Sequence, residues 1–335
     1  MQKTFTALTL ALIAAAPIGA QDKPAPALAP SEIVAAAPKA DWTTIAPSDL
    51  LVMDLAPDAE GKPRRVVIQL MPPPFSQGWV GNIRKLAAAR FWDGTSVNRV
   101  QDNYVVQWGD ATEKKALPAG LAKVPESAYT ISHADMTKVW VGGSSEAEIR
   151  DFFAKREKSK VRENILAIRN AIGGDSYALQ SAPFMGWPVA HDNLDFEARA
   201  WPVHCYGMVG VGRNLSPDTG TGAELYTVIG HAPRHLDRNI AVVGRVIEGI
   251  EHLSSLPRGT EALGFYRTAK ERTKIRSVRI GNEVAGLPTY EFLSTESGSF
   301  AQYADARANR RDAFFIRPAG GADVCNIPVP VRRVK

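Results

Sequence analysis

Short apolar runs rich in β-branched residues mark the first part of the chain. Leu50 to Leu55 (LLVMDL) and Arg65 to Leu70 (RVVIQL) are two of them, and the connector 57–63 holds Pro, Asp and Gly. Runs of this kind bounded by turn residues are typical of strands, and this connector suits a hairpin turn. Val97 to Val100 and Tyr104 to Trp108 repeat the pattern. The sequence therefore predicts these four runs as strands.

An apolar stripe with helical spacing lies between the second and third of these runs. Val80, Ile83, Leu86 and Ala87 fall on one side of a helix, which is the pattern of an amphipathic helix that covers a core. We therefore expect a helix over 79–90.

Three further runs, 204–211, 224–229 and 240–246, are apolar, β-prone and divided by loops rich in Gly, Asp and Pro. Many short strands, few helices and no regular alternation of strand and helix favour a mainly β fold, either a barrel or a sandwich.

The segment between the early and late strands is rich in charged residues and has helical signals. Twelve of the 29 residues from 144 to 172 are charged, and Ser145 and Glu148 have capping-box spacing,. Apolar residues give the stretch one face, and Gly173-Gly174 ends it,. We expect a helical insertion over about 113–180, of one or two helices that pack on the main domain. Phe152 and Ile165 should be buried, and the charged run 155–158 should face water.

The two ends of the chain differ from its body. Residues 1–20 combine one Lys, an apolar run and small residues before Gln21, which is typical of a secretory signal peptide, with an uncleaved anchor as the alternative. Residues 21–40, rich in Ala and Pro, are expected to form a tether. The main domain is then 41–285. A C-terminal extension, 286–335, combines a short helix over 295–311 with a proline-containing end.

No later segment reaches the roughly 18 uninterrupted apolar residues of a membrane span. The mature chain is therefore expected to be exported, to the periplasm in a Gram-negative cell, without an integral membrane segment.

Composition narrows the function classes. With 45% hydrophobic and 22% charged residues, the chain lies near globular averages,. A formal net charge of +5, spread thinly, gives no basis for nucleic-acid binding, which needs a concentrated basic face,. Two cysteines cannot build a disulfide-rich scaffold or a four-thiolate metal site,. The oligomeric state is left open.

The obvious motifs for metal or nucleophile chemistry are weak. His231 and His235 lie four apart, but Pro233 argues against a zinc-binding helix,. His204 and Cys205 are neighbours, and neighbours in a strand point to opposite faces, so a catalytic pair is not expected. No glycine-rich segment has the spacing of a phosphate-binding loop. We expect neither a metal nor a cofactor.

What stands out instead is an ordered series of short motifs. In chain order they are RVVIQL at 65–70, NIRKL at 82–86, FWDGT at 91–95, NRV at 98–100, YVVQWGD at 104–110, YGMVG at 206–210, GAELY at 222–226, HLD at 235–237 and VVGRVIEG at 242–249. This order resembles that of the cyclophilin-type peptidyl-prolyl cis-trans isomerases over roughly 64–110 and 188–282. The resemblance implies an eight-stranded closed β-barrel capped by two helices, with an outer groove that holds an X-Pro peptide.

The resemblance also implies a set of site residues. Arg99 matches the catalytic arginine, in NRV where the family usually has HRV. The substrate-binding positions correspond to Tyr104, Val105, Gln107, Val209, Gly210, Glu224, Tyr226, His235, Leu236 and Ile240.

Four of these positions depart from the family pattern. Glu224 replaces a glutamine, Tyr226 a pocket phenylalanine, Ile240 a histidine and Gly210 an asparagine. A carboxylate at 224 could pair with Arg99 and compete for its donors. Two functions follow: an isomerase that assists folding of exported proteins by acting on their X-Pro segments, or a non-catalytic proline-peptide-binding or assembly protein that uses the barrel as scaffold.

Cys205 and Cys325 are the two cysteines of a chain expected in an oxidising compartment, where disulfides form and persist,. Cys205 lies in an apolar run, whereas Cys325 lies in a tail with little core of its own. A bond between them would fix the tail to the barrel, and the alternative is two buried free thiols. The expected pairing is Cys205 with Cys325.

Overall fold

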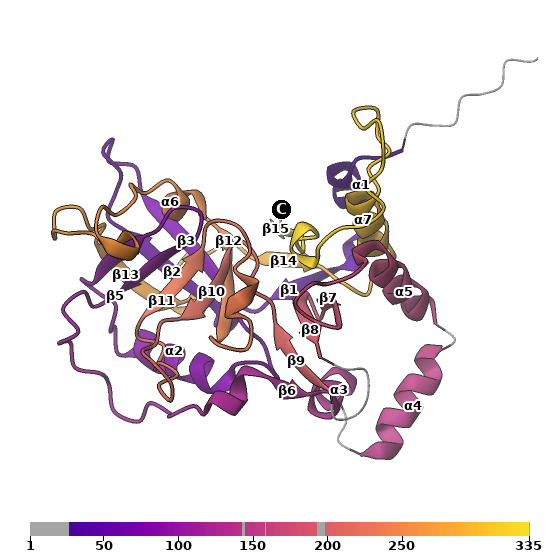
Figure 1. The fold of residues 1–335 in the computed structure, drawn as a ribbon, viewed down its shortest axis with the longest axis horizontal. Coiled ribbons are helices and arrows are strands. Elements are labelled where there is room, and N and C mark those ends of the chain that lie inside the picture. Colours follow the sequence, from indigo (N-terminus) through magenta and orange to yellow (C-terminus); the bar gives the residue numbers. More distant parts are fainter. Residues whose placement is uncertain (1–26, 143–144, 158, 193–197, 335) are drawn as a thin grey trace, which may run out of the picture.

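The computed structural model describes residues 27–142, 145–157, 159–192 and 198–334 (Figure 1). The expected signal peptide at 1–20 and the first residues of the expected tether at 21–40 lie outside the described residues. The described end of that tether is not an extended linker. Helix α1 (Pro30–Ala36) forms there, and Ile33 and Val34 pack against the main core. Apolar contact with the rest of the protein therefore orders the segment that composition alone assigned to a tether.

Eight antiparallel strands form the main sheet, in the order β13-β2-β3-β12-β10-β11-β5-β4. Its two outer strands come together, because the Ile275 amide donates to the Thr95 carbonyl at 2.8 Å and the Val97 amide to the Thr273 carbonyl at 2.9 Å. The sheet is therefore nearly closed into a barrel, which confirms the expected mainly β, eight-stranded architecture. The strands are β2 (Leu50–Leu55), β3 (Arg64–Leu70), β4 (Ser96–Val100), β5 (Val105–Gly109), β10 (Met208–Val211), β11 (Leu225–Val228), β12 (Val242–Glu248) and β13 (Ile275–Ile280).

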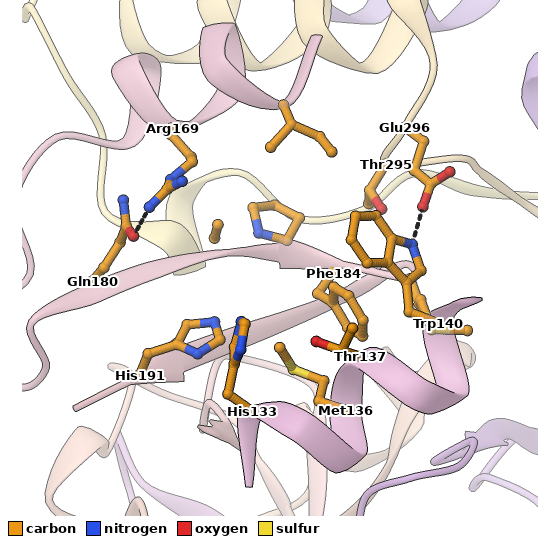
Figure 2. Close-up of a pocket in the computed structure, with 14 residues that line it drawn as sticks. His133, Met136, Thr137, Trp140, Arg169, Gln180, Phe184, His191, Thr295 and Glu296 are labelled. Atoms are coloured by element: carbon orange, nitrogen blue, oxygen red, sulfur yellow. Dashed lines mark hydrogen bonds between the residues drawn. The ribbon is translucent and has the colours of Figure 1, made fainter. Parts of the chain in front are cut away.

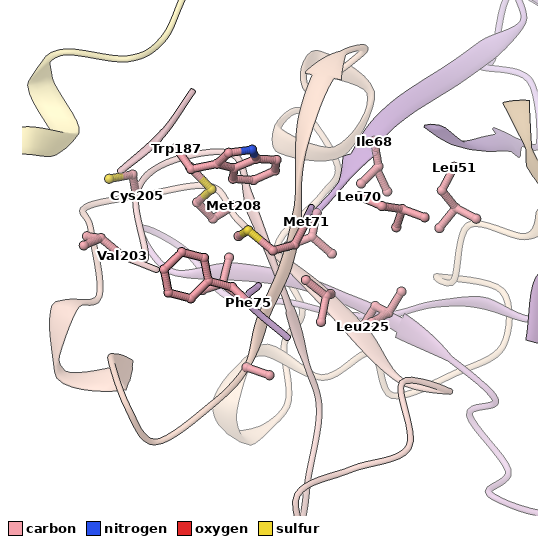
Figure 3. Close-up of a cluster of buried hydrophobic side chains, with 14 of the residues drawn as sticks. Leu51, Ile68, Leu70, Met71, Phe75, Trp187, Val203, Cys205, Met208 and Leu225 are labelled. Atoms are coloured by element: carbon pink, nitrogen blue, oxygen red, sulfur yellow. The ribbon is translucent and has the colours of Figure 1, made fainter. Parts of the chain in front are cut away.

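Two helices accompany the barrel. Helix α2 (Gln77–Ala88) buries the expected stripe of Val80, Ile83, Leu86 and Ala87, together with Trp79. The short α6 (Glu251–Ser254) follows β12 and contacts β3. The barrel core continues beyond the barrel, and Figure 3 shows part of it, from Leu51 and Ile68 to Trp187 on β8. One apolar cluster thus connects the barrel with its neighbours.

The insertion is larger than the sequence predicted. It holds three helices, α3 (His133–Val141), α4 (Glu146–Glu157) and α5 (Lys160–Ile172), where one or two were expected. It also contributes to a second sheet, in the order β6-β9-β8-β7, that the sequence did not predict. Its strands are β6 (Ile131–Ser132), β7 (Gln180–Phe184), β8 (Trp187–His191) and β9 (Arg199–Pro202). Strands β8 and β9 lie beyond the expected insertion limit of 180, and both belong to this sheet and not to the barrel.

The expected burial of the insertion is partly wrong. Phe152 is half-buried, with its ring 5.2 Å from that of Trp140, and Ile165 is also half-buried. Ile168 is the more deeply placed residue, at 2% exposed. Lys155 faces water, as expected, and its ammonium pairs with Asp151 at 2.6 Å. The remaining side chains of the run 155–158 lie outside what the structure describes.

The C-terminal extension reaches back to the start of the main domain. Strand β14 (Tyr290–Leu293) pairs with β15 (Val331–Arg333) and with β1 (Trp42–Ile45). Helix α7 (Gly298–Ala308) contacts both α1 and α5. Figure 1 shows α1, α5 and α7 gathered at the right, beside the barrel at the left. The expected domain limits at 41 and 286 therefore do not separate the two regions in space, since the first and last strands share one sheet. Among the described helices, none is long and apolar enough to cross a membrane.

A disulfide joins Cys205 to Cys325, with 5.1 Å between the two Cα atoms. Cys205 lies in the connection between β9 and β10 and not within a strand. The half-cystine at 325 lies in the one-turn helix Val324–Asn326 of the extension. The bond therefore fixes the extension to the entry of β10.

We expect the disulfide to contribute to stability by restricting the unfolded chain. It closes a loop with a sequence separation of 120, for which the chain-entropy estimate is roughly 4–5 kcal/mol, with measured values often smaller. Replacing both cysteines by alanine should lower the free energy of unfolding by about 2–4 kcal/mol. Urea unfolding with and without reductant measures this, because reduced wild type should match the variant. Two titratable thiols in denatured, unreduced protein would contradict the bond.

Candidate functional site

Arg99 lies on the outer side of the barrel, held by three acceptors. It stands opposite Gln107 in the register of β4 with β5. Its Nε donates to the Leu263 carbonyl at 2.6 Å, its Nη1 to Gln107 Oε1 at 3.1 Å, and its Nη2 to Gln101 Oε1. Partial burial lowers the pKa of Arg99 from its ordinary value, but a guanidinium remains protonated at neutral pH. The site therefore presents a fixed cation surrounded by neutral acceptors.

Glu224 does not form the expected ion pair with Arg99. Its Oε2 instead accepts a hydrogen bond from Gln107 Nε2 at 2.9 Å. Gln107 therefore lies between the two charges, with its oxygen toward Arg99 and its nitrogen toward Glu224. Burial raises the pKa of Glu224, and the hydrogen bond from Gln107 opposes this rise. The carboxylate orients the amide of Gln107 and does not itself accept a hydrogen bond from Arg99.

An apolar cluster lies beside the guanidinium, at the position of the expected proline pocket. Val105, Tyr226 and Val228 form its buried part, and Tyr104, Leu236 and Ile240 pack against them. The strands β5 and β11 supply the buried part, and the loop before β12 supplies Leu236 and Ile240. The structure thus brings together five residues that the sequence assigned to the pocket: Tyr104, Val105, Tyr226, Leu236 and Ile240.

Aromatic rings lie at the edge of this apolar cluster. The ring of His235 stacks on that of Tyr104, with 6.2 Å between centroids and 16° between planes. The guanidinium carbon of Arg99 lies 5.6 Å from the Tyr104 ring centroid and 5.5 Å from that of Phe265. Phe265 and Leu263 were missed by the sequence analysis, because the loop that carries them meets Arg99 only in the folded protein.

The side chain of one residue assigned to the groove points into the barrel core. Val209 is 1% exposed and its side chain belongs to the barrel core, so that side chain does not line the groove, and a role of Val209 in substrate binding stays a prediction. Side chains alternate between the two faces of a strand, and Gly210, the next residue, lies on the side of Tyr226. A Cβ atom at position 210 would stand 2.3 Å from both Cζ and the hydroxyl oxygen of Tyr226. A side chain at position 210 would therefore clash with the tyrosine at 226, and the glycine makes room for it.

The hydroxyl of Tyr226 begins a buried hydrogen-bonded chain. It lies 2.9 Å from His204 Nε2, and His204 Nδ1 lies 2.9 Å from Asp237 Oδ1. Asp237 also accepts from Arg234 Nε at 2.7 Å, and Arg234 Nη2 donates to Asp175 Oδ2 at 2.9 Å. A carboxylate can only accept, which assigns the proton of a neutral His204 to Nδ1 and makes Nε2 the acceptor of the Tyr226 hydroxyl.

The side chains of this hydrogen-bonded series are almost completely buried. The His204 side chain is 0% exposed, Asp237 4%, Arg234 2% and Asp175 1%. Burial also raises the pKa of Tyr226 well above its ordinary value, which keeps the phenol protonated. Sequence reasoning considered His204 only as a partner of Cys205 and missed the chain, because its members are far apart in the sequence.

His231 and His235, which lie four apart in the sequence, do not form a joint site. His235 stacks in the groove, whereas His231 is exposed. Among the described residues, no group of three or more His, Cys, Asp or Glu side chains could hold a metal ion.

Comparison with known proteins places these observations in context. Residues 65–280 match the family model of the cyclophilin type peptidyl-prolyl cis-trans isomerase/CLD. The crystal structure of a cyclophilin from Hirschia baltica is similar in fold, with a TM-score of 0.57 at 18% identity, over 88% of this chain and 94% of that one. A cyclophilin type peptidyl-prolyl cis-trans isomerase from Cryptosporidium parvum, solved in the presence of the dipeptide Ala-Pro, matches with a TM-score of 0.34 at 10% identity, over 68% of this chain and 98% of that one. No curated protein matches the chain.

The hydroxyl of Tyr226 should be important for stability. Tyr226→Phe keeps the ring but leaves a buried histidine nitrogen without a partner, which costs about 1–3 kcal/mol of the free energy of unfolding. Chemical denaturation measures the loss. Tyr104→Phe is the matched control, because that side chain is half-exposed at the groove, and its effect should stay within about 0.5 kcal/mol. A loss for Tyr226→Phe that also stays within about 0.5 kcal/mol would show that its hydroxyl does not stabilise the protein.

Proposed function

Because the chain belongs to the family of cyclophilin-type peptidyl-prolyl cis-trans isomerases, we propose that it is itself such an isomerase and acts at the groove beside Arg99. The observation that carries the proposal is the position of the guanidinium, fixed by Gln101, Gln107 and Leu263 at the edge of an apolar cluster. A positioned cation beside a site for a proline ring is what the reaction needs.

The chemistry requires no covalent intermediate. An X-Pro bond prefers trans by only about 0.5–1 kcal/mol, yet amide resonance gives its rotation a barrier of about 18–20 kcal/mol. During rotation the prolyl nitrogen becomes pyramidal, and its lone pair, which amide resonance delocalises in the planar forms, becomes localised on the nitrogen. A donor directed at that lone pair stabilises the twisted amide more than either planar form, which lowers the barrier.

Arg99 has donors to spare for this role. A guanidinium carries five N–H groups, and three of them are engaged, one each on Nε, Nη1 and Nη2. One N–H on each terminal nitrogen remains for the substrate. Tyr104, Leu236 and Ile240 would hold the proline ring, while Glu224 acts as a positioning residue through Gln107.

A non-catalytic proline-peptide-binding protein is the second candidate. One observation favours it: Ile240, where the family often has a histidine that contacts the substrate, packs as an apolar side chain in the pocket. Such a protein would bind X-Pro peptides without accelerating their isomerisation. We favour the isomerase because the arginine and its supporting acceptors are all in place.

The natural substrates would be X-Pro segments of exported polypeptides. This part of the proposal rests on the signal-peptide pattern of residues 1–20 and on the Cys205–Cys325 disulfide, which suits an oxidising compartment,.

Fractionation of cells that express the full chain tests the export. The wild type should appear in the periplasm, shortened by about 20 residues as expected for a cleaved signal peptide. A Leu12→Arg variant, with a charge in the apolar run, should remain in the cytoplasm at full length. Cytoplasmic retention of the wild type would refute export without bearing on the isomerase.

Arg99→Ala should lower the catalysed isomerisation rate by at least about tenfold, or 1.4 kcal/mol of barrier, because the donor to the prolyl nitrogen is lost. A protease-coupled assay on X-Pro tetrapeptides, with NMR exchange as a second readout, measures the rate. Arg276→Ala is the matched control, since Arg276 is an exposed arginine on β13, and it should retain full activity. Peptide affinity without any catalysis by the wild type would establish the second candidate instead.

A further inference from the structure

A cavity of about 370 Å³ lies outside the isomerase groove, in the region built by the insertion and the C-terminal extension. Helices α3 and α5 and strands β7 and β8 form its walls, with Thr295 and Glu296 at one side (Figure 2). None of the groove residues described above lines it. Its volume falls within the range of about 300–1,000 Å³ that is common for small-molecule sites.

One part of the cavity is apolar and aromatic. Met136 and Trp140 on α3, Ile165 on α5 and Phe184 on β7 line it. The rings of Trp140 and Phe184 meet edge to face, with 5.6 Å between their centroids. This part would bury an alkyl or aryl group favourably, at about 25 cal/mol per Å² of apolar surface.

The other part gathers basic side chains. Figure 2 shows Arg169 entering from α5 and His133 and His191 from the opposite side, on the same part of the cavity. The two imidazole rings are 6.0 Å apart. Trp140 and Glu296 lie at the other side, where Glu296 accepts the indole N–H at 2.6 Å. The basic and the apolar groups are therefore segregated.

No carboxylate neutralises the basic part at ion-pair distance. Arg169 donates to Gln180, a neutral amide, and none of the ion pairs among the described residues includes Arg169, His133 or His191. Burial, together with nearby His133 and Arg169, lowers the pKa of His191 to about 4, while Asp192 opposes them, so His191 is neutral at neutral pH. Arg169 is the cation of this part, and a partly buried charge without an opposite charge is unfavourable in an empty apolar cavity. An anion would relieve it and could also accept an N–H from an imidazole.

We propose that this cavity binds a small amphipathic acid, with its anionic group between Arg169, His133 and His191 and its apolar body against Trp140 and Phe184. A carboxylate matches the fork of an arginine guanidinium. The segregation of charge fixes the orientation of the ligand. The site is independent of the isomerase activity, because it shares no residue with the groove.

Calorimetry on the full-length oxidised protein at neutral pH tests the proposal with three probes of the same chain length. Octanoate should bind saturably. Octan-1-ol, without the charge, should bind at least about tenfold more weakly, equivalent to 1.4 kcal/mol, and octylammonium should not bind. Equal affinity for octanoate and octylammonium, or no saturable octanoate binding up to about 10 mM, would overturn the proposal.

Two variants locate the site. Arg169→Gln should weaken octanoate binding by about tenfold, whereas Lys160→Gln, an exposed cation on the same helix, should leave it unchanged. Equal losses would assign the effect to overall charge and overturn the site.

NMR on the wild type covers the case in which Arg169→Gln fails to fold. Octanoate should shift the ring signals of His133 and His191 and leave those of His231, an exposed residue outside the cavity, unchanged. Binding that shifts neither cavity histidine would place the ligand elsewhere and refute the proposal.

Discussion

The buried guanidinium of Arg234 is the constraint on which the arrangement of the molecule depends. It pairs with Asp237 in the loop before β12, with Asp175 in the insertion and, at 3.7 Å, with Asp323 in the C-terminal extension. Three segments far apart in the sequence therefore meet at one cation. Removing one partner of a buried ion pair typically costs 3–5 kcal/mol, because it leaves the other charge buried and uncompensated. The junction thus requires all three segments to be in place together.

The same junction supports the groove. Arg234 begins the short helical turn Arg234–Leu236, which carries His235 and Leu236 at the edge of the pocket. Through Asp237 and His204, the chain of hydrogen bonds also reaches the hydroxyl of Tyr226 in the pocket floor. The insertion and the extension are consequently linked, through Arg234, Asp237 and His204, to the buried side of the groove. The disulfide between Cys205 and Cys325 lies next to His204 and ties the extension to the same place.

The groove itself is organised by neutral acceptors. Arg99 donates to two side-chain amides and one backbone carbonyl, and the nearby carboxylate of Glu224 is kept one residue away by Gln107. A carboxylate bound directly to Arg99 would occupy the donors that the proposed reaction requires. The arrangement keeps Glu224 off the guanidinium and is compatible with that proposal. The glycine at 210 likewise gives Tyr226 the space that its side chain occupies, because a Cβ there would stand 2.3 Å from the tyrosine hydroxyl.

The sequence by itself predicted seven of the eight barrel strands, all but β13, and several of the residues that gather around Arg99. Alternating or continuous apolar runs marked the strands, and the order of short motifs identified Arg99, Gln107 and the pocket residues. These signals are local, because strand and helix periodicity depends on which face of an element meets the core.

Tertiary structure alone decided the rest. The second sheet was not predicted because its strands are short, three of them contain proline, and pairing such as that of β6 with β9 depends on contacts far along the chain. The inward direction of Val209, the loop of Leu263 and Phe265 over Arg99, and the chain from Tyr226 to Asp175 were missed for the same reason. Each depends on which residues face one another across the folded molecule, and the spacing of residues along one segment carries no information about that.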